Sequence, residues 1–371
     1  MRLHLWLTLL LSACAAPGQD SAADIPPDAD SDTADPFAGL TEPLEDGVDN
    51  GNLPGYQFVV QDAGGNVLFA SAGGDFDADQ AIPLDSSIKP VTAAVVLTLV
   101  DSGDLSLDST LRQEFGWRGA PGQVTVRDLL AFTSGFPGGA FCITPPPRLR
   151  DGDLVVPEPR RSLEACAESI RDSGVSATPG TTFRYGAAHQ HILAYLVEET
   201  TGRSFEAVFQ ERVRNPAGLS SSDIRYANDR VAAGAVGHAG AMATLFNHLG
   251  RDGSLLEGGP AGLLDPMVAQ ALFADDTRAN EVTIEESPWD RIGQVLHFGL
   301  GVWIDCEDFA DTSTCIWLGS GGNGTTVWID PASQTVGALV LYQGSFMGYL
   351  DGYTYMQTLL AAVREARDET R

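Results

Sequence analysis

The stretch "PLDSSIKPVTAAVVLTLVDSGDL", residues 83–105, contains Lys89, the only lysine among 371 residues. Ser86 lies three residues before Lys89, so on a helix the hydroxyl and the amine share a face. A serine needs an adjacent base to become a nucleophile. A lysine can be that base once its pKa is lowered, whereas an arginine cannot be deprotonated in a protein. The stretch therefore predicts a catalytic pair of Ser86 and Lys89.

The context of this pair favours a buried site. Asp85 is expected to cap the helix, which places Ser86 in the first turn, where the helix dipole favours negative charge. The apolar run "VTAAVVLTLV" predicts a buried scaffold. Pro90 removes one helical hydrogen bond, so we expect a distorted first turn. Ser-x-x-Lys alone is a weak motif, and an exposed helix pair is the alternative interpretation.

Predicted strands lie at both ends of the folded region. The runs "YQFVVQDAGGNVLFASAG" (56–73) and "TTVWIDPASQTVGALVLYQG" (325–344) each indicate two strands around a turn. A predicted helix, "YTYMQTLLAAVREARDE", closes the chain. The pattern predicts an α/β fold in which an antiparallel sheet from both chain ends is flanked by helices and carries a mostly helical insertion. Helices are predicted at 87–102, 125–132, 187–201, 204–213 and 240–251.

Further stretches follow the serine motif in a characteristic order. They are "VTVRDLLAFTSGFPGG" (124–139), "TPGTTFRYGAAHQHILAYLVEETTGRSFEAVFQERVRNPAGLSSS" (178–222), "FGLGVWID" (298–305) and "GSGGNGTTVWIDP" (319–331). Together they resemble the serine hydrolases of the class C β-lactamase, DD-peptidase and esterase type, from about residue 55 to 365. The resemblance implies the β-lactamase/DD-peptidase-like fold.

The resemblance also implies roles for particular residues. Ser86 matches the acylated serine, Lys89 its hydrogen-bonded base, and Tyr185 in "RYGA" the motif tyrosine. A phenolate or a Lys–Tyr proton relay would then activate the serine. The oxyanion would be held by the backbone N–H of Ser86 and by one in the third motif. The expected oxyanion and substrate-binding residues of that motif are Gly319, Ser320, Gly321 and Gly322.

Three positions depart from the family pattern. Ala187 stands where an asparagine is frequent, and Phe132 stands where a histidine is frequent, so we interpret Phe132 as packing. Gly319 replaces the lysine or histidine that would meet a substrate carboxylate, which β-lactams and D-Ala-D-Ala ends both carry. An arginine such as Arg184 could replace that cation.

The expected activity is that of a serine hydrolase acting through an acyl-enzyme on a small-molecule or peptide-like ester or amide, most of all an esterase. The alternatives are a β-lactamase or peptidoglycan DD-peptidase, and a non-catalytic binding lipoprotein on the same scaffold. No metal or cofactor is expected, because histidine and cysteine spacings match no metal motif. "GSGGNG" (319–324) precedes a predicted strand instead of the helix that a dinucleotide site needs. His189 and His191 are interpreted as structural.

The N-terminus predicts export. Residues 1–13 form a signal peptide, and "LSAC" (11–14) resembles a bacterial lipobox, which implies lipidation of Cys14. The alternative is an ordinary signal peptide with an incidental cysteine. Residues 14–52 are acidic and predicted to be a disordered linker, with the hydrolase domain at 53–371. The expected location is the cell envelope, with a lipid anchor in the bacterial outer membrane.

Charge and cysteines limit the possible partners and the redox environment. With 50 acidic and 22 basic residues, the net charge of −28 disfavours nucleic acid and anionic membrane surfaces as partners. The membrane is therefore expected to be reached only through the lipid anchor. Four later cysteines suggest disulfides, and three pairings are possible. Proximity in sequence favours Cys142–Cys166 and Cys306–Cys315.

Overall fold

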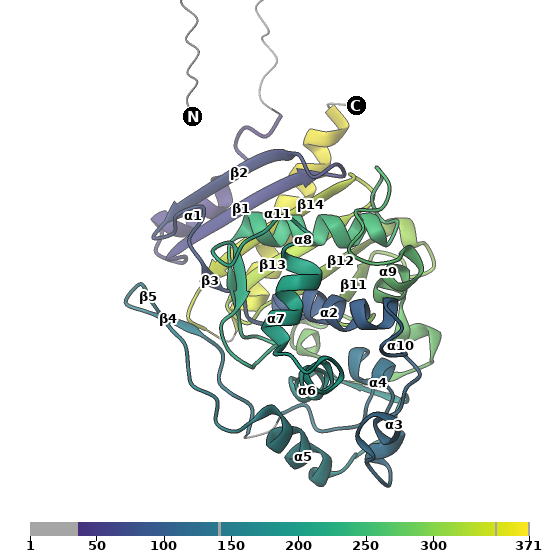
Figure 1. Cartoon of the computed structure of the whole chain (residues 1–371). Helices are drawn as coiled ribbons and strands as arrows, with labels where there is room; N and C mark the ends of the chain where they lie inside the picture. The colour runs from purple at the N-terminus through teal and green to yellow at the C-terminus, as the bar shows by residue number, and fades with distance from the viewer. Residues whose placement is uncertain (1–35, 140–141, 346, 370–371) are drawn as a thin grey trace, which may run out of the picture. The chain divides into compact units, whose positions relative to one another are not determined.

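A computed structural model of the chain describes residues 36–139, 142–345 and 347–369 (Figure 1). The predicted signal peptide, Cys14 and the first part of the predicted linker lie outside these residues.

A seven-stranded antiparallel sheet joins the two ends of the described chain, in the order β10-β11-β12-β13-β14-β1-β2. Phe58 in β1 lies opposite Leu339 in β14, so residues far apart in sequence are neighbours in the sheet. This confirms the predicted fold class. The strands are β1 (Gly55–Asp62), β2 (Val67–Gly74), β10 (His297–Phe298), β11 (Trp303–Cys306), β12 (Cys315–Ser320), β13 (Gly324–Asp330) and β14 (Thr335–Tyr342).

Helices cover both faces of the sheet (Figure 1). Alternate side chains along a strand point to opposite faces. Trp328 in β13 therefore joins one apolar cluster with Met356 of α11 (Gly348–Glu369). Its neighbour Val327 joins another with Phe246 of α8 (Ala239–Asp252). The 3₁₀ turn Asp85–Ile88, which contains Ser86, packs against β12 and β13 of this sheet.

The region between the chain ends is mostly helical, as predicted. Each of the five helices predicted there is present, although the fourth continues into a π turn, Gln210–Arg214. The helices of this region, α8 apart, are α2 (Lys89–Asp101), α3 (Leu111–Phe115), α4 (Val126–Leu130), α5 (Leu163–Ser173), α6 (Ala188–Thr201), α7 (Phe205–Phe209), α9 (Pro266–Phe273) and α10 (Asp276–Ala279). Short strands are β3 (Ile82–Pro83), β4 (Arg148–Arg150), β5 (Asp153–Val155), β6 (Thr182–Arg184), β7 (Ile224–Tyr226), β8 (Ala235–Gly237) and β9 (Thr283–Glu286).

The predicted linker boundary at residue 52 is wrong. Residues 42–49 form α1 (Glu42–Asp49), and Leu44 is 0% exposed. Phe37, Leu40 and Leu53 join Leu44 in the apolar cluster that includes α11. A few apolar side chains in an acidic segment are enough to bury one side of this short helix, so the folded domain includes residues 36–52.

We expect Leu44→Ala to lower the free energy of unfolding by ~2–4 kcal/mol, because it leaves a cavity in a packed cluster. Urea denaturation followed by circular dichroism measures the change. The matched control is Asp46→Ala on the exposed side of α1, which should stay within ~0.5 kcal/mol of wild type. Equal effects of the two variants would show that α1 does not stabilise the domain.

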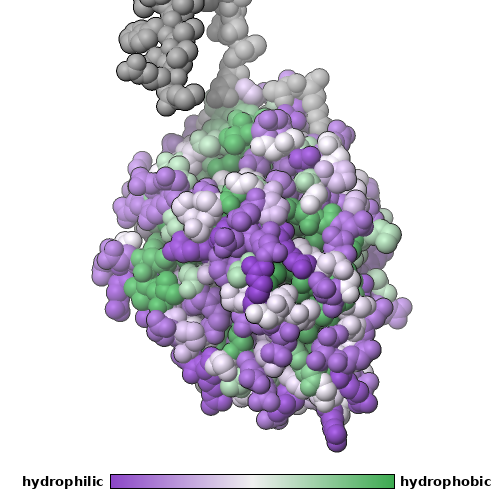
Figure 2. Space-filling model, viewed as in Figure 1, coloured by the Kyte–Doolittle hydropathy of each residue, from purple (hydrophilic) through white to green (hydrophobic). Residues whose placement is uncertain are grey.

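Both favoured cysteine pairings are present as disulfides, Cys142–Cys166 and Cys306–Cys315. Hydrophilic residues cover most of the face shown in Figure 2, with apolar residues in small patches. Within residues 36–139, 142–345 and 347–369, no helix combines the length and apolar character that a membrane span requires. The same residues contain no cluster of three or more metal-ligating side chains.

Candidate active site

Ser86 and Lys89 are in direct contact. The Lys89 Nζ donates to Ser86 Oγ at 2.6 Å and to the carbonyl oxygen of Ala232 at 2.9 Å. Lys89 is only 4% exposed. Ser86 lies in a 3₁₀ turn, Asp85–Ile88, that leads into α2, and Pro90 is the second residue of α2. The distorted first turn and the contact between the two side chains both agree with the prediction.

Asp85 does not cap the helix, which corrects the prediction. Its φ of +49° is strained for a residue with a side chain. Its carboxylate accepts hydrogen bonds from the backbone N–H of Asn323, at 3.0 Å, and from the Asn323 side-chain amide. Burial raises the pKa of Asp85 to about 6, against the lowering effect of these bonds. Asp85 thus ties the turn that contains Ser86 to the glycine-rich loop after β12.

Lys89 is set up to lose its proton. Burial, followed by repulsion from Arg230, holds the pKa of Lys89 well below the ordinary lysine value of 10.5, and the charge of Asp85 only partly opposes this. Burial lowers a lysine pKa because the charged form loses its hydration. A neutral amine in contact with Ser86 Oγ can accept the serine proton.

Tyr185 follows β6 and completes the cluster. The Lys89 Nζ lies 4.9 Å from the centroid of the Tyr185 ring, and that ring stacks on Trp303 at 5.3 Å. Burial raises the pKa of Tyr185 above its usual range, while a hydrogen bond with Ser86 opposes the rise. The phenol is therefore protonated near neutral pH and can relay a proton, but it is not a ready-made phenolate.

Phe132 and His189 support the tyrosine loop. Their rings stack with centroids 4.7 Å apart. The ring nitrogens of His189 lie 2.9 Å from Ser134 Oγ and 2.9 Å from the carbonyl oxygen of Arg184. Burial lowers the pKa of His189 to about 4, so the ring is neutral. The packing role of Phe132 and the structural role of His189 agree with the predictions.

The glycine motif lets β12 approach the nucleophile turn closely. A Cβ at Gly319 would lie 2.5 Å from the carbonyl oxygen of Ser87, and one at Gly321 would lie 2.6 Å from that of Leu84. No side chain fits at position 319 in this backbone, so no cation can be placed there. Ser320 and Gly322, in contrast, line a cavity beside Ser86.

The backbone N–H groups of Ser86 and Gly322 can serve as oxyanion donors. Within the described part of the chain, no hydrogen-bond acceptor is found for either. Ser86 is also near the start of its turn, where backbone N–H groups are normally unsatisfied. Two free N–H groups next to a nucleophile can stabilise the negative oxygen of a tetrahedral intermediate.

Arg184, which the sequence offered as a possible replacement for the missing cation, does not take that role. Its guanidinium donates to Ser176 and pairs with Glu285 at 2.5 Å. Arg184 lines neither cavity beside Ser86. Arg230 does line one of them, although no motif or spacing in the sequence points to it. Arg230 was therefore not among the residues predicted from the sequence, although it lines a cavity beside Ser86.

Two cavities meet at Ser86 and Gly322. The aromatic pocket, of about 60 Å³, is lined by Ser86, Tyr185, Pro288, Trp289, Trp303, Ser320, Gly322 and Tyr349. The arginine pocket, of about 330 Å³, is lined by Asp85, Ser86, Pro145, Pro146, Pro147, Arg148, Arg230, Ala233, Gly322, Asn323, Tyr342 and Gly344. Ser86, Tyr185, Ser320 and Gly322 were predicted from the sequence as site residues. The other lining residues come from separate segments of the chain and were not predicted.

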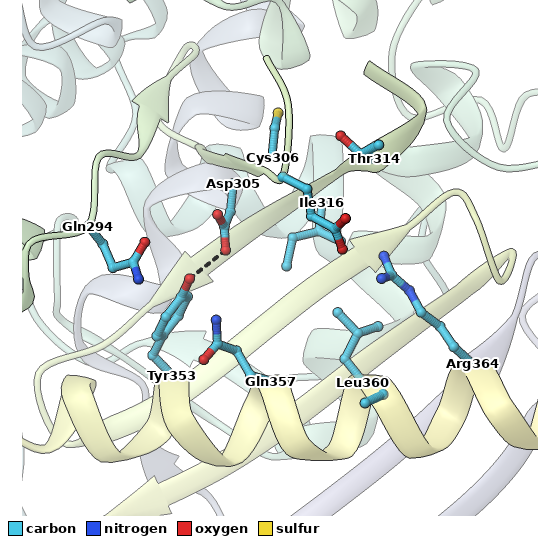
Figure 3. A pocket seen from close by; sticks show the side chains of 11 residues that line it. Gln294, Asp305, Cys306, Thr314, Ile316, Tyr353, Gln357, Leu360 and Arg364 are labelled. Carbon is cyan, nitrogen blue, oxygen red and sulfur yellow. Dashed lines mark hydrogen bonds between the residues drawn. The ribbon is translucent and has the colours of Figure 1, made fainter. Parts of the chain in front are cut away.

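A larger cavity, of about 490 Å³, lies away from the serine, between β11 and α11 (Figure 3). There the Tyr353 hydroxyl donates to the Asp305 carboxylate at 2.6 Å. Its lining contains no serine–lysine pair. Size alone would therefore select the wrong cavity, and the chemistry points to the two pockets beside Ser86.

Known proteins share the fold of this chain. The family model described as Beta-lactamase matches residues 40–353. A putative beta-lactamase from Bacteroides dorei aligns with a TM-score of 0.72 and 24% identity, over 88% of this chain and 98% of its own. EstCE1, a hydrolase with promiscuous acyltransferase activity, aligns with a TM-score of 0.69 and 18% identity, over 89% and 98% of the two chains. At these identities the two structures show a shared fold.

Curated relatives are matched over shorter stretches. Penicillin-binding protein 4 of Amycolatopsis lactamdurans is 31% identical over 161 residues, which is 42% of this chain and 39% of the relative. The unguisins hydrolase ungD' of Aspergillus campestris is 26% identical over 207 residues, 52% of this chain and 37% of the relative. The alignments thus span well under half the length of these relatives.

Proposed function

The chain belongs to the Beta-lactamase family, and on that premise we propose that it is a serine hydrolase that forms an acyl-enzyme at Ser86 and prefers esters to β-lactams. One observation carries the proposal, the 2.6 Å contact between Ser86 Oγ and the buried amine of Lys89. Such a contact supplies the adjacent base that a serine nucleophile requires.

The reaction would proceed in two halves. Neutral Lys89 takes the proton of the Ser86 hydroxyl while Ser86 Oγ attacks the carbonyl carbon of the substrate. The backbone N–H groups of Ser86 and Gly322 stabilise the resulting oxyanion. When the bond to the leaving group breaks, Tyr185 gives its proton to the departing oxygen and takes one from Lys89. Water then attacks the acyl-enzyme by the reverse sequence of proton transfers and releases the acid.

The expected preference for esters follows from the pocket that receives the leaving group. Tyr185 lines the aromatic pocket, so the leaving group departs there. No cation is among the described residues that line this pocket. A carboxylate in that position would lose hydration without gaining a partner. A neutral alcohol has no such cost. Ala187 also supplies no side-chain amide for a substrate amide.

We expect kcat/KM for p-nitrophenyl butyrate to exceed that for benzylpenicillin by at least about tenfold, the lower bound for one lost charge-assisted hydrogen bond. Spectrophotometric assays at the same pH measure both values. Parallel labelling with a fluorophosphonate and a fluorescent penicillin should favour the fluorophosphonate. A higher kcat/KM for the penicillin would reverse the substrate order and support the alternative, a β-lactamase or DD-peptidase.

That alternative has support of its own. One relative is named a penicillin-binding protein, and D-aminopeptidases from Gluconobacter oxydans and Cereibacter sphaeroides also match parts of the chain. The lining of the aromatic pocket favours the esterase reading.

A further inference from the structure

We propose that the arginine pocket binds a carboxylate on the acyl part of the substrate, so that the enzyme selects esters whose acyl chain carries a negative charge. This inference rests on the proposed function. It concerns Arg148 and Arg230, which lie in the same cavity as the nucleophile.

The orientation of the substrate follows from Tyr185. This residue lines the aromatic pocket and is absent from the lining of the arginine pocket. Since Tyr185 protonates the leaving group, the leaving group lies in the aromatic pocket. Ser86 and Gly322 line both pockets, so the reacting carbonyl lies at their junction. The acyl chain therefore extends into the arginine pocket, whose 330 Å³ exceed the 60 Å³ of the aromatic pocket.

The two arginines are available for an anion. In the described part of the chain neither forms an ion pair, although other arginines, such as Arg127 and Arg364, pair with carboxylates. Arg230 uses one nitrogen, Nη1, to donate to the carbonyl oxygen of Thr144 at 3.0 Å, and its buried Nε has no partner. Arg148 is exposed at the rim of the pocket.

Charge in the pocket contrasts with charge in the whole chain. The net charge is −28, so an anionic substrate is repelled unless the site offers local positive charge. Among the described residues that line the pocket, Asp85 is the one acidic side chain, and its carboxylate accepts hydrogen bonds from Asn323. The two guanidinium groups of Arg148 and Arg230 outnumber the single carboxylate of Asp85, so the pocket carries a net positive charge. A guanidinium also matches the planar geometry of a carboxylate.

Arg230 is held in place before any substrate arrives. Its backbone N–H donates to Asn228 Oδ1 at 3.1 Å, and Asn228 Nδ2 donates to the carbonyl oxygen of Pro145 at 3.1 Å. The disulfide Cys142–Cys166 fixes the start of this proline-rich wall. Binding groups that are already ordered cost less entropy when the ligand binds.

The test compares two esters with the same leaving group, monomethyl glutarate and methyl butyrate, in a pH-stat assay. The readout is the ratio of kcat/KM for the anionic ester to that for the neutral ester. We expect wild type to favour monomethyl glutarate. The ratio should fall about tenfold or more in Arg230→Gln and about threefold in the more exposed Arg148→Gln. The control Arg118→Gln, an exposed arginine outside both pockets, should keep the wild-type ratio.

The ratio is the readout because the positive charge of Arg230 also helps to lower the pKa of Lys89. Arg230→Gln is therefore expected to change the absolute rates for both esters. A wild-type enzyme without preference for the anionic ester, or variants with an unchanged ratio, would overturn the proposal. A second measurement separates it from the hydrolase proposal. Calorimetry with glutarate and the Ser86→Ala enzyme should give a Kd that rises about tenfold when Arg230→Gln is added.

These results separate the two proposals. Glutarate binding that depends on Arg230, without turnover of either ester by wild type, would overturn the hydrolase reading and keep the anion site. Turnover of both esters without selectivity, together with glutarate binding that does not depend on Arg230, would overturn the anion site and keep the hydrolase.

Discussion

Ser86→Ala is expected to abolish covalent labelling by a fluorophosphonate and to lower ester turnover by ~10⁴-fold or more, the scale on which removal of a nucleophile acts in serine hydrolases. The physical reason is that no other hydroxyl lies in contact with the amine of Lys89 among the described residues. Ser86 is only half-buried, and its side chain packs little apolar surface. The variant should therefore keep the wild-type circular dichroism spectrum and melting temperature.

The neighbouring serine gives a matched control. Ser87 Oγ donates to the carbonyl oxygen of Leu84 at 2.7 Å and is buried away from the pockets. Ser87→Ala should cost ~1 kcal/mol of stability and still be labelled. Intact-protein mass spectrometry detects the label. Fluorophosphonate labelling that persists in Ser86→Ala, or that is lost only in Ser87→Ala, would assign the nucleophile to another residue.

The sequence was sufficient to predict the fold class and the contact between Ser86 and Lys89, because both depend on local or periodic signals. Alternating strands at both chain ends predicted one sheet, and β1 pairs with β14. The spacing of Ser86 and Lys89 on one helix predicted their contact. Helix geometry alone relates two side chains three residues apart, so no tertiary information was needed.

The contacts that the sequence could not predict are those between distant segments. Asp85 looked like a helix cap, yet its partner is Asn323, which lies 238 residues further along the chain. Arg184 was a candidate partner for a substrate carboxylate because it adjoins Tyr185 in sequence. In the structure its guanidinium pairs with Glu285 instead. Arg230 carries no local motif, and only the fold brings it near Lys89.

Burial also decides the proton-transfer roles of Tyr185 and Lys89, both of which were predicted from the sequence as site residues. The resemblance allowed Tyr185 to act as a phenolate or in a relay. Burial raises its pKa and, first among several causes, lowers that of Lys89. The proton is therefore more easily lost from Lys89 than from Tyr185, which favours the relay. The sequence does not give the solvent exposure of individual side chains, so the structure was needed to choose between a Tyr185 phenolate and a proton relay.

Lys89→Arg is expected to lower kcat/KM for p-nitrophenyl butyrate by at least ~10²-fold, although it keeps the positive charge. An arginine cannot give up its proton in a protein, so the base is lost. Since Arg is larger than the buried Lys89, we pair this variant with Lys89→Met, which fills similar space without a base, and confirm both folds by thermal melting.

The pH profile of the wild-type enzyme tests the same base. Deprotonated Lys89 is the active form, so kcat/KM should rise with pH through the lowered pKa of Lys89 and level off well below 10.5. Ionisation of Asp85, with a pKa of about 6, adds a negative charge that makes Lys89 harder to deprotonate, and Arg230 acts in the opposite direction. In Lys89→Arg and Lys89→Met the rise assigned to Lys89 should disappear. Activity within a few fold of wild type in both folded variants, with the rise retained, would show that Lys89 only supports the structure.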